Sequence, residues 1–353
     1  MATKKKAAAK RPAKKDRKAA PKALPAAVTV PAAAPKAAGR KTGLVLGALA
    51  VLLVAIGAQV FFLARHQAAL DLNLVRVGTQ IPYGMDQGQA LSPQNLQGDK
   101  QDNLYFLEGM GGQAPGLLKF DPLNRFLVRY KPARPAEVLV DVADLAVSAQ
   151  GAVYVLQKSG DIKVFDSELK FQRAFKVSVS APTGMGIDSK DRLFISSMND
   201  NKVQIFTATG APAGEFGSPG SNTGDLASPV RLRVGADDLV VVLELLSDGL
   251  RLKSFTPDLK LKRQVKVKDI PWSEAMRMGL NADDIVILND SATNKAVGFY
   301  DMRAGELRGY AKGTTDNILF LSPGSCGANE YSRSFFIHSV GGLTRALIPA
   351  PGK

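Results

Sequence analysis

Side chains that could carry out nucleophilic or acid–base chemistry are few in this sequence. The chain has one cysteine, Cys326 in "SPGSCGANE", and one histidine beyond residue 66, His338 in "FFIHSVGG". A thiol and an imidazole form a nucleophile–base pair only where the fold brings them together, which the sequence leaves open. One histidine cannot supply the several His, Asp or Glu ligands of a catalytic metal site. The sequence therefore predicts that the protein is not an enzyme, with no catalytic, metal-binding or cofactor-binding residues.

Two acidic pairs and one tryptophan are the other candidates for a site. Asp237-Asp238 and Asp283-Asp284 offer carboxylates of the kind that bind calcium, yet each pair precedes a β run, where aspartate commonly forms the turn. We therefore interpret both pairs as turn residues. For Trp272, in "DIPWSEAMRMG", buried packing is favoured over a role as an exposed contact anchor. The sequence contains no phosphate-binding glycine loop, paired-cysteine motif or HExxH helix.

The elements that must position these residues recur with a regular period. Beyond residue 100 a tight β run repeats six times, and a second run that ends in an aromatic residue follows it in five units. The first runs begin 49, 40, 46, 46 and 50 residues apart, and the second runs end 45, 41, 49 and 45 residues apart. The first runs begin at Leu104, Val153, Leu193, Leu239, Ile285 and Phe335, and the second end at Phe120, Phe165, Phe206, Phe255 and Tyr300.

A unit of about 40–50 residues built from short strands has the length of a propeller blade. Six units predict an all-β fold, a closed six-bladed β-propeller over residues 100–350, because closure removes exposed edge strands. The absence of long amphipathic helices from this part of the sequence argues against a βαβ fold. Residues 65–99 are expected to be a linker in which "LDLNLVRVG", from Leu70 to Gly78, supplies the outer strand of the last blade; a plain linker is the alternative.

The third unit resembles a known repeat family over its whole length. "PTGMGIDSKDRLFISSMNDNKVQIF", residues 182–206, is similar to the NHL repeat, with the inner strand expected at Leu193 to Ile195. It departs from that family's pattern where Ser197, Asp200 and Lys202 replace an acidic residue, an asparagine and an arginine. The resemblance implies a propeller that serves as a partner-binding platform. The residues that carry it are Pro182, Gly184, Asp188, Phe194, Lys202 and Phe206.

A long apolar segment precedes these units. Gly43 to Leu63 is 21 residues without a charge and with one strongly polar side chain, Gln59. It is long enough for the roughly 30 Å hydrocarbon core of a bilayer. We therefore predict a transmembrane signal-anchor helix over residues 43–64; a cleaved signal peptide and a buried soluble helix are the alternatives. Gly43 and Gly47 form a GxxxG pair through which two such helices could associate as a homodimer.

Residues 1–42 form a Lys/Ala/Pro-rich segment. Thirteen Lys and Arg against the single acid Asp16 give it a net charge of +12, out of +14 for the whole chain. This composition predicts a disordered tail. The positive-inside rule predicts that the tail is cytoplasmic and that the propeller lies across a bacterial inner membrane, in the periplasm. The tail is expected to contact anionic lipid or, as the alternative, to bind nucleic acid nonspecifically. Its first nine cations are Lys4, Lys5, Lys6, Lys10, Arg11, Lys14, Lys15, Arg17 and Lys18.

Together these features predict a single-pass, membrane-anchored NHL-like propeller that acts as an extracytoplasmic binding or scaffolding module, with envelope proteins bound by its loops and no cofactor. Two alternatives stay open: a propeller enzyme of lactonase, lyase or hydrolase type, and an envelope tether whose basic tail binds nucleic acid. The lining of the central channel distinguishes an enzyme from a binding module, because clustered His, Asp or Glu would favour the enzyme.

Overall fold

The computed structural model describes the part of the chain that carries the repeated β runs. The predicted tail and transmembrane segment, residues 1–64, lie outside it. None of the helical segments in the described part of the chain could span a bilayer. The described residues are 74–84, 86–109, 114–220, 222–267, 270, 272–273, 276–289, 297–311, 326–339 and 342–348.

Strands of the described residues form six four-stranded antiparallel sheets, each one a blade of a propeller. The prediction of an all-β, six-bladed propeller is confirmed. From the innermost to the outermost strand, the blades are β2 (Pro93–Gly98), β3 (Leu104–Glu108), β4 (Gly116–Phe120) and β5 (Phe126–Arg129); β6 (Val142–Val147), β7 (Val153–Gln157), β8 (Asp161–Phe165) and β9 (Phe171–Lys176); β10 (Pro182–Ile187), β11 (Leu193–Ser197), β12 (Lys202–Phe206) and β13 (Pro212–Phe216); β14 (Pro229–Val234), β15 (Val240–Leu246), β16 (Gly249–Phe255) and β17 (Leu261–Val267); β18 (Arg277–Leu280), β19 (Ile285–Asn289), β20 (Val297–Asp301) and β21 (Glu306–Ala311); and β22 (Cys326–Ala328), β23 (Phe335–Ser339), β24 (Gly342–Leu347) and β1 (Val75–Pro82).

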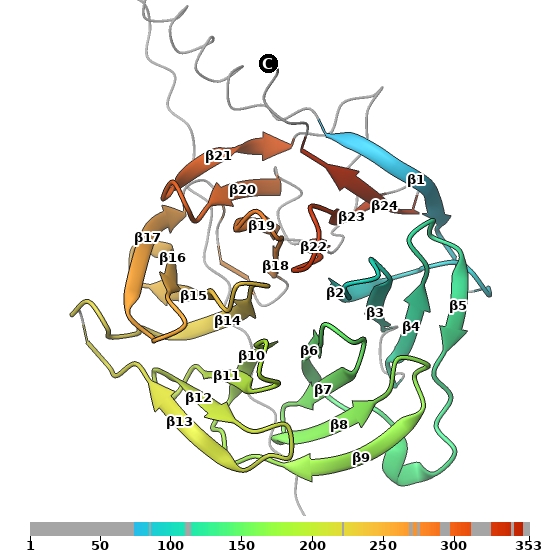
Figure 1. Ribbon diagram of the computed structural model, residues 1–353, viewed down its shortest axis with the longest axis horizontal. Helices are drawn as coiled ribbons and strands as arrows, with labels where there is room; N and C mark the ends of the chain where they lie inside the picture. Colours follow the sequence, from blue (N-terminus) through green and yellow to red (C-terminus); the bar gives the residue numbers. More distant parts are fainter. Residues whose placement is uncertain are drawn as a thin grey trace, which may run out of the picture. The chain divides into compact units, whose positions relative to one another are not determined.

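Six inner strands, one from each blade, surround the axis of the ring (Figure 1). The two repeated β runs of the sequence are the second and third strands of the blades. Leu193 to Ile195, expected as an inner strand, belongs to β11, and β10 lies between it and the axis. The inner strands escape a search for apolar runs because polar side chains interrupt them, as in "PQNLQG" and "PVRLRV".

The sixth blade combines the two ends of the described chain. β1 runs antiparallel to β24, with Val75 opposite Leu347, and is the outer strand of that blade. Hydrogen bonds from this strand also reach the first blade: Asn124 Nδ2 donates to the Thr79 carbonyl, and Thr79 Oγ1 donates to the Leu123 carbonyl. β1 therefore closes the ring as the outer strand of the last blade, and the innermost strand of the first blade, β2, lies before residue 100 as well.

Most turns at the far ends of the inner strands have one form, a polar residue followed three positions later by a residue with positive φ. Asp188 Oδ1 accepts from the N–H groups of Lys190 and Arg192, and Asp191 has a φ of 56°. Asp238 (φ 62°) and Asp284 (φ 60°) occupy the position of Asp191 in their own turns. The described residues contain no group of three or more His, Cys, Asp or Glu that could hold a metal, and the two acidic pairs lie in turns.

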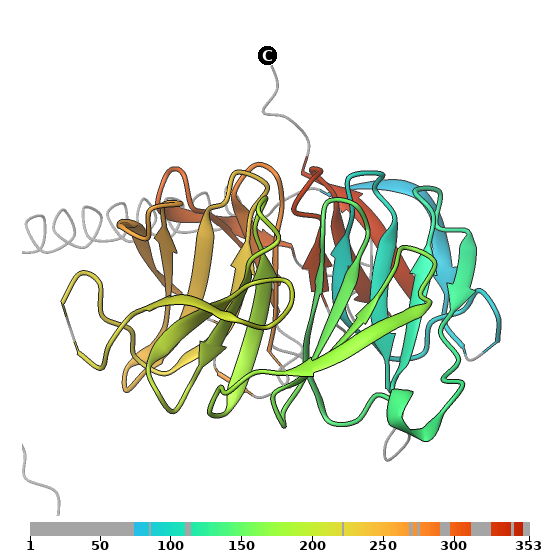
Figure 2. The ribbon, with the colours of Figure 1, turned by 60° about the horizontal axis from the view of Figure 1, so that its bottom comes forward.

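The core lies between neighbouring blades. One buried cluster joins Tyr105 of β3 to Val155 of β7 and Phe165 of β8. Near the axis the inner strands approach closely: a Cβ on Gly279 of β18 would lie 2.4 Å from the backbone nitrogen of Ala328 in β22. Glycine is required there because any side chain would push the two blades apart. Figure 2 shows the turns of the blades gathered at two opposite faces of the ring.

Candidate functional site

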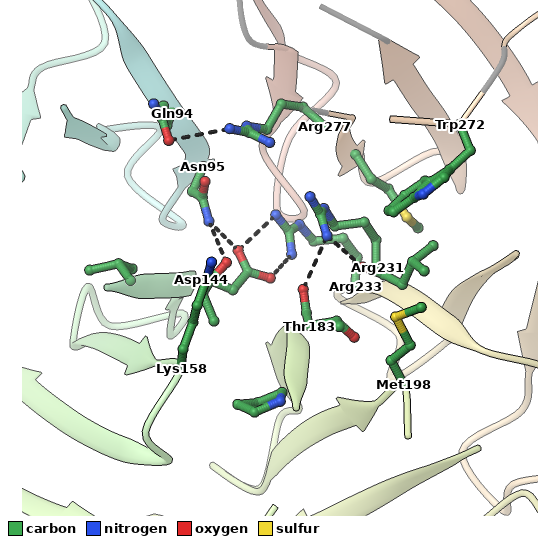
Figure 3. A pocket seen from close by; sticks show the side chains of 15 residues that line it. Gln94, Asn95, Asp144, Lys158, Thr183, Met198, Arg231, Arg233, Trp272 and Arg277 are labelled. Atoms are coloured by element: carbon green, nitrogen blue, oxygen red, sulfur yellow. Dashed lines mark hydrogen bonds and ion pairs between the residues drawn. The ribbon is translucent and has the colours of Figure 1, made fainter. Parts of the chain in front are cut away.

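Inner strands of five blades enclose a cavity of about 390 Å³ near the axis of the ring. Its lining comes from the first residues of β2, β6, β10, β14 and β18, from the turns that follow β7 and β11, and from the segment before β18. Figure 3 shows its labelled side chains converging from different blades. The cavity therefore lies at the face of the ring where the inner strands begin.

A buried ion pair crosses the cavity between the second and fourth blades. Arg233 Nη1 lies 2.6 Å from Asp144 Oδ2, and Nη2 lies 3.2 Å from Oδ1. The two side chains are only 3% and 1% exposed. Asn95 Nδ2 and the Met185 N–H donate to the same carboxylate, at 2.7 and 2.9 Å. Burial is the largest single influence on the pKa of Arg233 and acts to lower it, but the charge and the hydrogen bonds of Asp144, with weaker charges nearby, together raise the pKa.

A second arginine, Arg231, lies on the same strand two residues before Arg233, so both side chains share one face of β14. Arg231 Nε donates to the Met276 carbonyl at 3.1 Å, and Nη1 donates to the Val230 carbonyl at 2.6 Å. Its guanidinium lies 5.8 Å from the centre of the Trp272 ring, which partly lines the cavity. These contacts fix the cation beside an aromatic surface.

A third arginine enters the cavity from the fifth blade. Arg277 Nη2 donates at 3.2 Å to Oε1 of Gln94, a neutral acceptor on β2 of the first blade. Burial lowers the pKa of Arg277, an effect that the charge of Asp144 opposes. The guanidinium is still a cation at neutral pH, because an unperturbed arginine titrates far above it.

The charged lining of the cavity is mostly positive. Lys158, in the turn between β7 and β8, adds a fourth cation, and Asp144 is the one carboxylate among the described lining residues. A low-dielectric pocket with such an excess concentrates an electric field that attracts anions. The arrangement can therefore bind a small anion.

A protonatable carboxyl group lies at the other end of the inner strands. Glu330 is the second residue after β22 and is 5% exposed. Its Oε2 atom has no hydrogen-bond partner. Burial raises the pKa of Glu330 to about 8, although the charge of Arg233 opposes the increase. At neutral pH this side chain is therefore mostly neutral.

Cys326 and His338 do not meet. Cys326 of β22 lies opposite Ile337 in the neighbouring strand β23. Both side chains pack in a buried cluster that includes Ile287 of the fifth blade. His338 is the next residue along β23, so its side chain leaves the other face of the sheet, where it stacks on Tyr83 at 6.2 Å between ring centroids. Burial raises the pKa of the Cys326 thiol to about 12 and lowers the pKa of His338 to about 4. The two residues cannot act as a nucleophile and its base.

The residues of the NHL-like repeat divide between the cavity and the blade core. Pro182 lines the cavity, and a Cβ on Gly184 would lie 2.5 Å from the backbone nitrogen of Leu232 in β14. Phe194 and Phe206 are buried. Asp188 accepts from the Arg192 N–H in the turn after β10. Lys202 forms an ion pair with Glu215, with 2.8 Å between Nζ and Oε2.

The departures from the NHL pattern form a contact of their own. Ser197 Oγ donates to Asp200 Oδ2 at 2.7 Å, and the Asp200 N–H donates back to Ser197 Oγ at 3.2 Å. Ser197 Oγ also lies 2.5 Å from the Ser180 carbonyl, in the connection from the preceding blade. Glu244 of β15 lies opposite Pro229 as Ser197 lies opposite Pro182, and it accepts a hydrogen bond from the Ala227 N–H at 2.9 Å. This position ties a blade to its incoming connection.

Sequence reasoning missed the three cavity arginines and Asp144. A signal was present, because the fourth unit contains "PVRLRV", in which two arginines alternate with apolar residues in a strand. Charges on one face of a strand next to a propeller axis must line the channel or be paired within it. Trp272, expected to be packed in the core, is half-buried and lies against both the core and the cavity. The basic tail and the membrane-segment residues Gly43, Gly47, Gln59 and Leu63 lie outside the described residues.

No protein-family model matches the chain, and no curated protein matches it. The NHL family is therefore not confirmed. Solved structures with similarity to this propeller include virginiamycin B lyase from Staphylococcus aureus, 14% identical with a TM-score of 0.46 over 80% of this chain and 90% of that chain. A streptogramin B lyase is 15% identical, with the same TM-score and coverage. A protein of unknown function from Bacteroides thetaiotaomicron is 12% identical with a TM-score of 0.48, over 78% of this chain and 75% of that chain.

At these identities the similarity concerns the fold alone. One sequence-based prediction is nevertheless corrected. The prediction that the protein is not an enzyme, made from the scarcity of catalytic and metal-ligating side chains, is contradicted by this comparison, because two of the similar structures are lyases. The fold therefore gives no ground for excluding catalysis.

Proposed function

We propose that the propeller binds a small anionic ligand in the cavity at the start of its inner strands. The observation that carries this proposal is the charged lining: four cations and one carboxylate around about 390 Å³. Cavities of about 300–1,000 Å³ are typical of small-molecule sites.

The electrostatic argument rests on where the cations lie. Asp144 is engaged by Arg233, Asn95 and two backbone N–H groups, which hold its carboxylate in the wall. Arg231 and Arg277 are half-buried, and their guanidinium groups donate to backbone carbonyls and to the neutral amide of Gln94. An anion that enters this cavity would meet a lining with more cations than carboxylates in a partly dehydrated site, where charge-assisted hydrogen bonds are strong.

Contacts between blades hold the cavity in shape. Thr183 Oγ1 donates to the Pro229 carbonyl at 2.7 Å and joins the third blade to the fourth. Asn95 and Gln97 of the first blade reach Asp144 and the Leu145 carbonyl of the second blade, at 2.7 and 2.6 Å. A preorganised site loses little conformational entropy on binding, which favours affinity.

The proposal is tested with the full-length chain in detergent micelles. Thermal unfolding is measured at constant ionic strength in chloride, acetate, succinate and inorganic phosphate. A ligand that binds only the folded state raises the Tm by mass action, so at least one of the last three anions is expected to raise it. The rise should shrink in Arg231→Gln and in Arg277→Gln.

Arg173→Gln is the matched control, because it removes the same charge from an exposed position of β9. The anion effect should persist in this variant. If no anion raises the Tm of the wild-type chain, or if the rise is equal in all four proteins, the proposed function is wrong.

The proposals about the membrane rest on the sequence. We propose that residues 43–64 anchor the propeller at the periplasmic side of a bacterial inner membrane, that the basic tail contacts anionic lipid or nucleic acid, and that NHL-like blade loops bind envelope proteins. Because Cys326 is 1% exposed, a topology test needs another thiol. A membrane-impermeant maleimide should label Lys190→Cys, in a Cys326→Ala background, in intact spheroplasts. Labelling only after lysis would place the propeller in the cytoplasm instead.

A further inference from the structure

Exposed apolar side chains are not spread evenly around the outer rim of the propeller. Five large apolar residues are exposed in the described part of the chain, and four of them lie on or beside β1 and β5. Single exposed apolar residues are ordinary on a protein surface, whereas a group of them indicates a contact surface. The four residues, each roughly half exposed, define the apolar rim: Val75, Tyr83, Leu123 and Leu127.

β1 and β5 are the outer strands of neighbouring blades and lie side by side on the rim (Figure 1). The Thr79 hydroxyl of β1 donates to the Leu123 carbonyl at 2.9 Å. In the loop after β1, a Cβ on Gly88 would lie 3.7 Å from the Cβ of Phe126 in β5. The two strands and this loop therefore present one continuous edge.

A hollow of about 340 Å³ lies in this edge beside β5. Residues 126–128 supply its apolar lining, and Lys131 adds an exposed cation. Arg76, which is exposed on β1, is a second cation, and Asp86 in the loop after β1 offsets one of these charges. Apolar side chains flanked by cations match a phospholipid surface, where acyl chains lie beneath anionic phosphates.

The opposite side of the ring has an edge of another kind. In Figure 1, β17 of the fourth blade lies across the ring from β1 and β5. Its exposed residues are Arg263, Gln264 and Lys266. Such side chains favour contact with water over contact with acyl chains. The side of the ring that suits a bilayer is therefore the one that carries β1 and β5.

The chain also enters the described structure at this edge. Leu74 directly precedes β1, and nine residues, 65–73, separate it from the segment predicted to span the membrane. A stretch of this length covers at most about 35 Å when fully extended. Such an anchor holds β1 close to the bilayer surface, where even a weak contact forms because the effective concentration is high.

We propose that the apolar rim docks on the surface of a phospholipid bilayer, with Tyr83, Leu123 and Leu127 at the level of the headgroups. This proposal rests on the anchor proposed for residues 43–64 and is independent of anion binding. Docking by the rim leaves both faces of the ring in water. The cavity at the start of the inner strands then stays open to a dissolved anion.

The experiment measures how close two positions of the rim lie to lipid. The full-length chain, in a Cys326→Ala background, is placed in nanodiscs of phosphatidylcholine and phosphatidylglycerol that contain a lipid with a nitroxide on its headgroup. A fluorophore is attached at Gln87→Cys, which lines the hollow, or at Gln264→Cys, which is exposed on β17. Both substitutions replace an exposed glutamine and keep the apolar rim intact. The nitroxide should quench the first fluorophore and not the second.

Further variants test which side chains make the contact. Leu123→Ser together with Leu127→Ser should abolish the quenching at Gln87→Cys, because the apolar contact with lipid is lost. Val140→Ser removes an exposed apolar side chain outside the apolar rim. It is the matched control, and the quenching should persist in it. Equal far-UV circular dichroism and Tm values establish that these variants are folded.

The outcomes separate docking from anchoring. If the chain does not elute with the nanodiscs, the proposed anchor fails and the docking proposal fails with it. If the chain elutes with them but the two fluorophores are quenched equally, docking is overturned while the anchor stands. If unquenched Gln87→Cys instead forms a disulfide-linked dimer, a second copy covers the apolar rim and the assignment to lipid is overturned.

Discussion

Arg233 and Asp144 form a bidentate ion pair near the axis of the ring, although 89 residues separate them in the sequence. The pair joins the second and fourth blades and skips the third. The arginine is 3% and the aspartate 1% exposed, so neither charge has access to bulk water. Removing one partner leaves the other as a buried charge without its counterion, which strongly lowers the free energy of unfolding. Replacing both partners by apolar residues costs much less.

Asp144→Asn is therefore expected to lower the free energy of unfolding by about 3–5 kcal/mol. Urea unfolding followed by far-UV circular dichroism measures it. Asp258→Asn removes one partner of an exposed pair, Asp258–Lys260, and should leave the urea midpoint unchanged. Equal losses in the two variants would contradict the role assigned to burial.

Glu330 is expected to make the protein less stable as the pH rises. Its pKa is about 8 in the folded chain and about 4.3 in an unfolded chain. Between these values the folded state binds more protons than the unfolded state, so stability falls with increasing pH across this window. The effect is complete above pH 8 and absent below about pH 4.

Glu330→Gln should remove this contribution. Relative to the wild type, the variant should gain stability between pH 5 and pH 8, by an amount on the order of a few kcal/mol. Urea midpoints at the two pH values provide the comparison, with Glu168→Gln as the exposed control. A wild type and variant that differ equally at both pH values would show that Glu330 does not titrate in this range.

His338 is expected to act in the opposite direction. Burial lowers its pKa to about 4, so below the unfolded value of about 6.5 the unfolded state binds the extra proton. Stability should therefore fall as the pH decreases from about 6.5 to about 4. His338→Phe keeps a ring against Tyr83 and removes the Nε2 atom that has no partner. Its Tm should depend less on pH than the wild-type Tm between pH 7 and pH 5, and an unchanged dependence would refute this assignment.

Gly279→Ala is expected to destabilise the contact between the fifth and sixth blades. Its Cβ would lie 2.4 Å from the Ala328 nitrogen and 2.5 Å from the Gly327 carbonyl carbon. Overpacking of this kind costs about 1–3 kcal/mol, which chemical denaturation can measure. A Cβ on Gly224 would meet nothing within 4 Å, so Gly224→Ala is the matched control and should retain the wild-type midpoint.

The part of the fold that could be predicted from sequence is the part whose strands are apolar on both faces. β7 ("VYVLQ") and β11 ("LFISS") each lie between two strands of their own sheet and are buried along their whole length. Their apolar runs therefore recur once in each blade. The inner strands carry buried polar residues such as Gln97, Asp144 and Arg233, which bond from one blade to another. Their pattern therefore varies from blade to blade, and no repeat revealed them.

The site was harder to predict because its residues are assembled by the ring and not by a motif. Gln94 and Arg277 share a hydrogen bond across 183 residues, and no local spacing encodes that contact. The sequence left open whether Cys326 and His338 meet, and the alternation of side chains along β23 keeps them on opposite faces of the sheet. A charged residue in an otherwise apolar strand was the available signal.

The pairing of β1 with β24 bears on how the protein is made. During synthesis β1 leaves the ribosome first among the described strands, and its partner leaves last, because Val75 pairs with Leu347. Until then β1 is an unpaired edge, which is open to proteases and to other chains. A polypeptide that ends early never covers this edge. A chain that stops before β24 therefore differs from one that contains it by an exposed strand edge at β1.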